Sequence, residues 1–461
     1  MKRVVFIAVF VLIMFGLSIA QMADNQYRGF PTFGYLDYNS SGFGARSRAM
    51  GGVYMALNHE GFNSFLNPAC MVYTEKSVMS MEVVSSQDEY KDKYLYRELF
   101  LGFGDTVVTQ DPFAYITYHE MDGAHTKLIQ AGAVTPFTYF DRDLWFGGGF
   151  RTVYDLHVKF DTQVSPGLGE IFTVKKGIDA LNMSLAAKPV ENIGLGFNMN
   201  YYIRGYESNT YFDSSGFVNA HQRDRSNFSG VNFDFGAVAD FEIVRLGLVI
   251  RTGYTLTQKS VYFHSGGVNV YGDDAGLLDR ITVKTKFPMT YGGGLSVFPM
   301  ENFMLAFDID LRPYSKVRLD IDNEHLDWMD FDEFDPEWED LTQFRIGAEY
   351  VFDAGFADVP LRAGFHILPS LKTNESYHID TVRVDDMLEF EMQTISKGDQ
   401  MTTNILSFGT GMKFDKIWFD VAYEFGSSKH DNTISIYRGY TLDEPLEYKY
   451  SRLYVSMGML F

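Results

Sequence analysis

The chain has only one cysteine and, beyond its first twenty residues, no long apolar run. Cys70 has no second cysteine with which to form an internal disulfide, so we expect it to be a small buried residue. No later stretch holds the roughly 18 consecutive apolar residues that a membrane-crossing helix needs. These absences exclude a disulfide scaffold and a helical-bundle membrane protein. Any insertion into a bilayer must therefore use β-strands.

Basic residues are also scarce. The chain has 39 Lys and Arg against 60 Asp and Glu, which gives a formal net charge of −21 at pH 7. Because a strongly negative surface repels the phosphate backbone, we expect no nucleic-acid partner.

Motifs for catalysis and cofactor binding are missing as well. The ten histidines are scattered, and no His-Glu-x-x-His, Cys-x-x-Cys or Gly-x-Ser-x-Gly spacing occurs. The glycine runs Gly147–Gly149 and Gly292–Gly294 lie inside strand-like segments with no helix after them, which favours close packing or strand bending over phosphate binding. We expect no enzyme activity, no cofactor and no metal centre of a catalytic kind. An outer-membrane phospholipase or protease is the alternative.

The first twenty residues have the pattern of a secretory signal peptide. Lys2 and Arg3 precede the apolar run Val4–Leu17, and small residues follow up to Ala20. We expect residues 1–20 to be a signal peptide cleaved after Ala20, with a retained anchor helix as the alternative. Loss of Lys2 and Arg3 with this peptide would take the net charge from −21 to −23.

The rest of the chain is rich in aromatic residues and glycine. Aromatic residues make up 16% of it, with 29 Tyr and 41 Phe, and 42 Gly are spread along it. From Lys76 onward, aromatic, aliphatic or Gly residues alternate with polar ones, as in Asn227–Phe241 and Thr342–Phe352. About 9–11 residues suffice for a transmembrane strand. We therefore expect residues 76–461 to form an all-β transmembrane barrel with an up-and-down antiparallel topology.

The connections between these segments alternate in length. Short turns are expected at residues 138–143, 189–192, 242–245, 299–302, 353–358 and 415–416, and long connections at 161–179, 205–227, 258–284, 313–341, 369–402 and 426–447. This alternation is typical of a barrel with periplasmic turns at one rim and external loops at the other. It predicts about 14 strands, or 16 if residues 94–120 add a hairpin to the barrel.

A glycine-rich segment, residues 41–69, lies between the signal peptide and the first strand. Its glycines disfavour a long helix, so we expect a packed, irregular element. The segment contains Arg46, Arg48, Gly51 and Gly52 and ends in the tripeptide Asn67-Pro68-Ala69. In these residues it resembles the N-terminal plug of the FadL-like outer-membrane long-chain fatty-acid transporters. One departure is Asn58-His59-Glu60-Gly61, where an acidic turn would be expected, and it leaves the role of that turn open.

The resemblance implies that residues 21–75 form a plug inside the barrel and that the residues named above hold or gate it. It also implies passive uptake of a long-chain fatty acid or another hydrophobic small molecule. PorV-like barrels share the plug signature, so a component or shuttle of a protein secretion system is the alternative function. The expected partners are outer-membrane lipid and a hydrophobic ligand, or secretion-system proteins in the alternative.

The end of the chain supports the same localisation. Ser451–Leu460 alternates like a strand and is followed by a terminal aromatic residue, Phe461. This pattern resembles the C-terminal strand that the barrel assembly machinery recognises. It implies that this machinery is a partner and that the protein lies in the outer membrane of a Gram-negative type cell.

The segment Asp320–Asp340 is strongly acidic and falls on an expected external loop. Its carboxylates could coordinate Ca²⁺, and the candidate ligands are Asp330, Asp332 and Asp335. The segment lacks the glycine of an EF-hand loop. A solvated acidic loop anchored by aromatic residues such as Trp338 is the simpler interpretation.

Overall fold

Strands make up nearly all of the structure. The computed structural model describes residues 44–97, 114–122, 125–155, 158–165, 168–214, 220–265, 276–323, 331–384, 387–436 and 440–461. The helical elements are short: α2 (Ala45–Ala49), η1 (Glu60–Phe65), η2 (Pro68–Tyr73) and η3 (Tyr314–Lys316). Within the described ranges, no helix is both long enough and apolar enough to cross a membrane. The strands are β1 (Val78–Arg97), β2 (Ala114–Asp122), β3 (His125–Tyr139), β4 (Arg142–Asp155), β5 (Val158–Ser165), β6 (Leu168–Val190), β7 (Ile193–Ile203), β8 (Tyr206–Ser214), β9 (Ala220–Phe241), β10 (Val244–Arg251), β11 (Tyr254–Ser265), β12 (Gly276–Phe287), β13 (Thr290–Met300), β14 (Phe303–Arg312), β15 (Arg318–Asn323), β16 (Phe331–Phe334), β17 (Leu341–Asp353), β18 (Asp358–Val384), β19 (Met387–Lys413), β20 (Ile417–Ile436) and β21 (Tyr440–Leu460).

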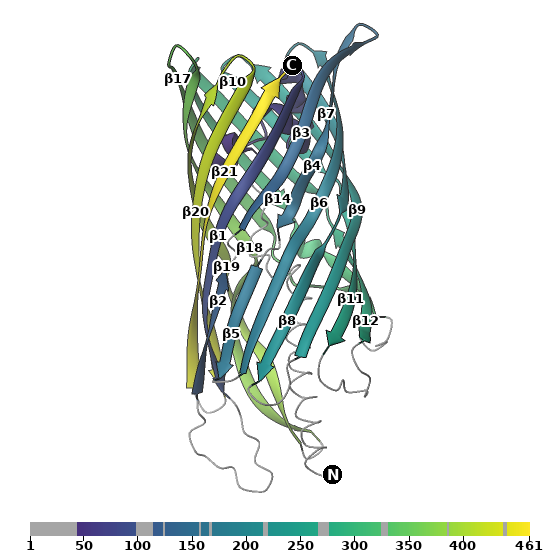
Figure 1. Cartoon of the computed structure of the whole chain (residues 1–461), viewed down its shortest axis with the longest axis vertical. Coiled ribbons are helices and arrows are strands. Elements are labelled where there is room, and N and C mark those ends of the chain that lie inside the picture. The colour runs from purple at the N-terminus through teal and green to yellow at the C-terminus, as the bar shows by residue number, and fades with distance from the viewer. Residues whose placement is uncertain are drawn as a thin grey trace.

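These strands form one closed barrel (Figure 1). Several of them are successive pieces of one stave, namely β2 with β3, β4 with β5, β7 with β8, β10 with β11, β12 with β13, β14 with β15 and β16 with β17. Neighbouring staves pair antiparallel, and β1 closes the barrel against β21. The predicted barrel of 14 strands is therefore confirmed.

The short turns at one rim agree with the prediction, whereas the long connections at the other rim do not. All six short turns fall where they were expected, for example at Glu191-Asn192 and Asp415-Lys416. The expected long loops are instead largely strand, since β18 and β19 pair along almost their whole length. The described parts of residues 94–120 likewise extend existing staves, because residues 94–97 of β1 pair with residues 114–117 of β2, so the 16-strand alternative is wrong.

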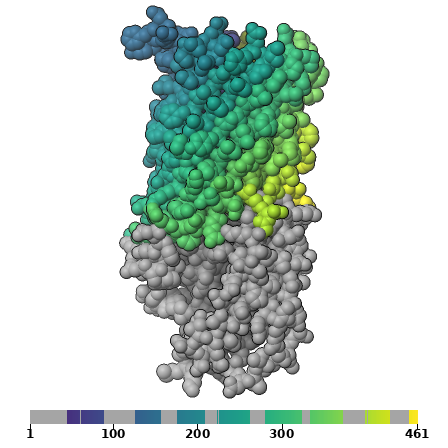
Figure 2. Space-filling model, turned by 180° about the vertical axis from the view of Figure 1, so that it is seen from behind, coloured from purple at the N-terminus to yellow at the C-terminus, as the bar shows by residue number. Residues whose placement is uncertain are grey.

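The outer face of the short-turn half is apolar. On β9 the outward side chains from Val231 to Phe241 include Phe233 and Phe235, and these four are 37–56% exposed. Ten residues of strand correspond to about 33 Å of length, and a tilt of roughly 40° turns this into a band about 25 Å tall. Figure 2 shows the slanted rows of outward side chains on this side. Such a band fits the hydrocarbon core of a bilayer.

The inner face has two zones. Towards the short turns, the N-terminal segment of residues 44–75, here called the inner segment, is almost completely buried inside the barrel (Figure 1). Beyond it lies an apolar cluster of inward side chains that includes Tyr202, Leu256, Phe287 and Trp338. Trp338 is 3% exposed and belongs to this cluster, whereas Asp335, Glu337 and Asp340 beside it are exposed. The described end of the acidic segment therefore agrees with an acidic loop anchored by aromatic residues.

Candidate functional site

The inner segment fits the barrel because the wall carries glycine on the strands it touches. A Cβ at Gly247 of β10 would lie 1.9 Å from the Met55 carbonyl oxygen, and one at Gly364 of β18 would lie 2.0 Å from the backbone nitrogen of Gly51. Corresponding close approaches occur at Gly132, Gly149, Gly196, Gly236 and Gly347. The expected role of Gly147 and of Gly292 and Gly294 in close packing is confirmed, because a Cβ at each would meet Met71 or Met55.

Asn67 ties two parts of the inner segment to the wall. Its backbone is extended, as the following proline requires, and its Oδ1 accepts from the Ala69 N–H at 3.1 Å. Its Nδ2 donates to the Met55 carbonyl at 2.7 Å and to the Ala237 carbonyl of β9 at 3.3 Å. Pro68 and Ala69 lie against the glycines of β7 and β9. The predicted need for satisfied polar groups around this tripeptide is met by the Asn67 side-chain amide together with the Asn67 carbonyl, which accepts from the Cys70 N–H at 3.0 Å.

We predict that Asn67→Ala loosens the inner segment without unfolding the barrel. The change removes three hydrogen bonds and leaves buried backbone groups without a partner, at a cost of about 1–3 kcal/mol for each unsatisfied group. Strand pairing does not depend on this side chain, so the folded form should still shift in mobility on boiling. The test is leakage of a small polar dye from proteoliposomes, with Asn302→Ala in an exposed turn as the control. Equal leakage from both variants would contradict the prediction.

Arg46 and Arg48 both meet carboxylates of the barrel wall. Arg46 makes two contacts with Glu349 of β17, at 3.0 Å from Nε and 2.6 Å from Nη2, and its Nη1 donates to the Asn58 carbonyl at 2.7 Å. Arg48 is fully buried, stacks on the Tyr454 ring at 4.8 Å and interacts electrostatically with Glu82 and Glu424.

The carboxylate that receives Arg46 belongs to a chain of ion pairs. Arg362 of β18 contacts Glu349 as well as Asp420 of β20. The inner segment is thereby joined through Arg46 to three neighbouring strands. Loss of Arg46 would leave Glu349 with Arg362 as its remaining described ion-pair partner.

Gly51 and Gly52 form the turn that follows α2. Their φ values are 70° and 78°, which favour glycine over any residue with a side chain. The Gly51 N–H donates to Ser407 Oγ of β19 at 2.8 Å. The turn therefore requires glycine for both conformation and space.

A second anchor, which the sequence did not indicate, lies at Tyr54. Asp308 of β14 accepts hydrogen bonds from the backbone N–H groups of Tyr54 and Met55, at 2.6 and 3.1 Å. The Tyr54 hydroxyl accepts from Arg251 at 2.6 Å and donates to Asp310 at 3.2 Å. Burial raises the pKa of Tyr54 to about 12, so the hydroxyl stays protonated.

Asp310 is the centre of this anchor. It is fully buried and pairs with three cations, Arg251 at 3.5 Å, Arg312 at 3.3 Å and Arg345 at 3.7 Å. The three arginines come from β10, β14 and β17, and their convergence on Asp310 could not be predicted from the sequence, because it depends on the pairing of the strands.

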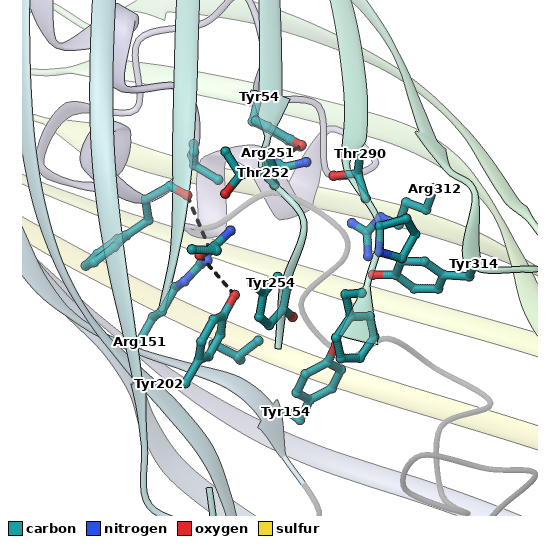
Figure 3. Close-up of a pocket in the computed structure, with 16 residues that line it drawn as sticks. Tyr54, Arg151, Tyr154, Tyr202, Arg251, Thr252, Tyr254, Thr290, Arg312 and Tyr314 are labelled. Atoms are coloured by element: carbon teal, nitrogen blue, oxygen red, sulfur yellow. Dashed lines mark hydrogen bonds between the residues drawn. The ribbon is translucent and has the colours of Figure 1, made fainter. Parts of the chain in front are cut away.

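A small cavity, called the aromatic pocket here, lies on the side of the inner segment that faces away from the short turns (Figure 3). Its floor is made by Tyr54, Phe65 and Leu66, and its walls carry stacked rings. The ring centroid of Tyr254 lies 5.0 Å from the ring centroids of both Tyr202 and Phe287. The cavity volume is about 70 Å³. An apolar cavity of about 150 Å³ is known to hold benzene, so a hydrophobic ligand requires a shift of the floor or of the rings.

A second cavity lies on the short-turn side of the inner segment, and it is called the turn-side pocket. It is lined by Arg46, His59 and Phe62 of the inner segment and by Trp418 of β20 among others, with a volume of about 200 Å³. Phe62 and Phe65 belong to the same short helix, η1, yet they face different pockets. Burial lowers the pKa of His59 to about 3, so its ring is neutral at physiological pH.

The wall beside the aromatic pocket is interrupted. The pairing of β10 with β13 ends at Arg251 and Thr290, and the pairing of β11 with β12 starts at Tyr254 and Phe287. Residues 252–253 and 288–289 lie between these ladders without pairing to each other, and Pro288 has no N–H to offer. Thr252 and Pro288 line the pocket, so this interruption between β10/β11 and β12/β13 lies next to a cavity.

The candidate calcium ligands are only partly within the described residues. Asp330 lies outside them, and so does the side chain of Asp332. The Asp335 carboxylate pairs with Arg318 at 3.1 Å and accepts from the Glu337 N–H at 2.9 Å. Among the described side chains, no group of three or more His, Cys, Asp or Glu is arranged to hold a metal ion.

Cys70 is fully buried next to Met55, as its isolation in the sequence predicted.

Comparison with known proteins shows which solved structures share this architecture. No family model matches the sequence, and no curated protein matches it. Among solved structures, a FadL homologue of Pseudomonas aeruginosa aligns with a TM-score of 0.58 and 14% identity over 92% of this chain and 98% of its own. The toluene transporter TodX of Pseudomonas putida has a TM-score of 0.55 with 12% identity, and the toluene transporter TbuX of Ralstonia pickettii has 0.51 with 13%. Both alignments cover 92% of this chain and 100% of the other. The chain therefore has the fold of the FadL-like outer-membrane transporters.

Proposed function

We propose that this protein is an outer-membrane transporter for small hydrophobic compounds and that the inner segment is its plug. The observation that supports this most directly is the position of the inner segment between two cavities, with η1 contributing a phenylalanine to each. The stacked rings of the aromatic pocket offer an apolar surface, and the structural neighbours described as FadL homologue and toluene transporters carry the same fold.

The interrupted wall supports sideways release as the exit route. A compound held beside Tyr254 and Phe287 lies next to the break between residues 252–253 and 288–289. The outward residues at this height, Ile250 and Met289, are apolar and 41–42% exposed. A hydrophobic compound that passes the break meets hydrocarbon and not water, which favours its transfer to the bilayer.

We predict that Phe287→Ser lowers uptake of the hydrophobic substrate about tenfold or more. The reason is that the substrate loses its contact with an aromatic ring, and burying such a ring contributes a free energy of roughly 1.5–3 kcal/mol. Uptake of radiolabelled toluene and oleate, measured in parallel in cells expressing each variant, is the assay. Met289→Ser is the matched control, since it removes an outward apolar side chain two residues away. The substrate whose uptake falls identifies the ligand class, aromatic hydrocarbon or fatty acid.

Wild-type uptake of both compounds by Phe287→Ser would contradict the transport proposal. Co-purification of a secreted protein together with unchanged uptake would favour the alternative of a secretion-system barrel. Equal loss in the two variants would show that the effect comes from barrel stability and would remove the support for the aromatic pocket.

A further inference from the structure

The aromatic pocket has two chemically different ends (Figure 3). The end beside Tyr54 carries the guanidinium groups of Arg251 and Arg312 and the hydroxyl groups of Thr252 and Thr290. The other end is formed by the aromatic rings of Tyr154, Tyr202 and Tyr254, with Phe287 stacked on Tyr254. Three of the residues that line this cavity are arginines, and none of them is Asp or Glu. The pocket is therefore cationic at one end and apolar at the other.

Arginines outnumber carboxylates around the cationic end. Three carboxylates interact with the arginines there, and each is at most 1% exposed: Asp234, Asp308 and Asp310. The arginines number four: Arg151, Arg251, Arg312 and Arg345. The nearby Asp179 adds nothing to this balance, because it pairs with Arg204 at 2.8 Å. Among the described side chains, one positive charge is therefore in excess at this end of the pocket.

The three carboxylates are engaged away from the cavity. Asp308 accepts from two backbone N–H groups of the inner segment, those of Tyr54 and Met55. Asp234 accepts from the side-chain amides of three residues of β7 and β9, namely Asn198, Asn200 and Asn232. Asp310 pairs with its arginines, and none of the three carboxylates lines the pocket. A ligand in the pocket therefore meets the arginines and not the carboxylates.

Two buried donors at the cationic end have no acceptor among the described residues. Thr290 is 7% exposed, and its hydroxyl makes no hydrogen bond with any of them. Arg251 Nη1 makes none either, although it lies 3.5 Å from the Asp310 carboxylate. Nearly all buried donors in proteins have an acceptor, because an unsatisfied one has lost its hydrogen bonds to water. Both residues line the cavity, so a ligand there can supply the acceptor.

A carboxylate meets the requirements of the cationic end. It carries one negative charge, which matches the one positive charge in excess. Its two oxygens accept from guanidinium N–H groups in a planar geometry, and such charge-assisted hydrogen bonds are stronger than those between neutral groups. It also offers acceptors to Arg251 Nη1 and to the Thr290 hydroxyl. A neutral hydrocarbon has no acceptor, so it would leave both donors unsatisfied and the positive charge uncompensated.

The apolar end favours an aromatic body over an alkyl chain. Tyr254 stacks between Tyr202 and Phe287, with interplanar angles of 12° and 17°. A further flat ring can extend such a stack, because aromatic rings attract each other when their faces are offset. The cavity is also small, at about 70 Å³. An apolar cavity of about 150 Å³ holds benzene, so one ring requires a limited opening and a long acyl chain a much larger one.

We propose that the aromatic pocket binds a small aryl carboxylate, with its charged group at Arg251, Arg312 and Thr290 and its ring beside Tyr254. Toluene has the ring without the charge, and a fatty acid has the charge without the ring. The bound carboxylate compensates the one positive charge in excess, which is costly to keep buried without a counter-charge. This inference rests on the proposed function, because it names the class of compound that the transporter holds before release.

The test is the binding of three probes to the purified protein in detergent, measured by titration calorimetry. The first probe is benzoate. The second is benzyl alcohol, which has the aromatic ring without the charge, and the third is cyclohexanecarboxylate, which has the charge without the aromatic ring. We expect benzoate to bind at least about tenfold more tightly than benzyl alcohol and about threefold more tightly than cyclohexanecarboxylate, because only benzoate suits both ends of the pocket.

Substitutions at the cationic end should weaken the binding of benzoate. We expect a loss of about tenfold or more in Arg312→Gln, and Arg312→Lys, which keeps the charge, should restore most of the affinity. Thr290→Val should weaken binding about threefold, and it breaks no hydrogen bond with a described residue. The matched control is Arg452→Gln, which removes another buried arginine, outside the lining of this pocket, and should bind benzoate like the wild type.

The outcomes separate this inference from the transport function. Equal binding of benzoate and benzyl alcohol, or wild-type benzoate binding in both Arg312→Gln and Thr290→Val, would overturn the inference and leave transport of neutral compounds untouched. Binding of cyclohexanecarboxylate as tightly as benzoate would contradict the role of the rings. Arg312-dependent binding of benzoate without uptake of benzoate or toluene in cells would support the site and contradict transport. The mobility shift on boiling verifies that each variant is folded.

Discussion

Gly247→Val is expected to give a barrel that assembles but leaks. The new Cβ would lie 1.9 Å from the Met55 carbonyl oxygen and 2.4 Å from its carbon, and backbone atoms cannot move away by changing a rotamer. The inner segment must shift instead. Overpacking of this kind costs about 1–3 kcal/mol, which favours the displaced segment by roughly 5- to 150-fold. Single-channel conductance in planar bilayers is the measurement, and we expect frequent or permanent openings.

The glycine run of β13 provides the control for this experiment. Gly293 points outward between two inward glycines, and a Cβ there would meet nothing closer than 3.6 Å. Gly293→Val should therefore conduct like the wild type, while the boiling-induced shift in mobility verifies that both barrels are folded. A closed barrel in Gly247→Val would mean that the inner segment is not the barrier to ions.

Asp310→Asn is expected to have the largest effect on stability. Asp310 and Arg345 are fully buried, and the substitution would leave three arginines without this counter-charge. Removing one member of a buried ion pair costs about 3–5 kcal/mol, because the remaining charge stays desolvated. The Tyr54 hydroxyl would lose its charged acceptor at the same time. The measurement is the temperature at which the compact gel form converts to the extended form.

Two further variants provide the comparison for the transition temperature of Asp310→Asn. Tyr54→Phe removes the hydroxyl but no charge, and we expect a smaller shift, corresponding to about 0.5–1.5 kcal/mol for each hydrogen bond lost. Asp141→Asn, in an exposed turn, should leave the transition unchanged. If Asp310→Asn behaved like Asp141→Asn, the cluster around Asp310 would not hold the inner segment.

The position of the aromatic pocket could not be predicted from the sequence. Tyr202, Tyr254 and Phe287 come from three staves, and their stacking depends on the register of β9, β11 and β12. A shift of one residue would turn each ring to the outer face. The contacts of Asn67-Pro68-Ala69 were easier to predict from the sequence, because this tripeptide acts largely within the inner segment.

The extent of the barrel beyond the membrane was also decided by tertiary structure. Residues 369–402 were expected to be a long connection, yet they form the paired ends of β18 and β19. Backbone hydrogen bonds between the two strands hold these ends together, and the sequence does not specify that pairing. The folding of Trp338 into the lumen has the same cause, because its partners Phe287 and Tyr314 lie on other parts of the chain.

By itself the sequence determined the all-β barrel and its short turns. These properties depend on local patterns: period-two alternation, turn residues, and glycines and a proline at fixed places. Tertiary structure alone decided which side chains meet, including the three arginines at Asp310 and those that line the two pockets. Those contacts join residues far apart in the chain, and their geometry follows from strand register, which no local pattern specifies.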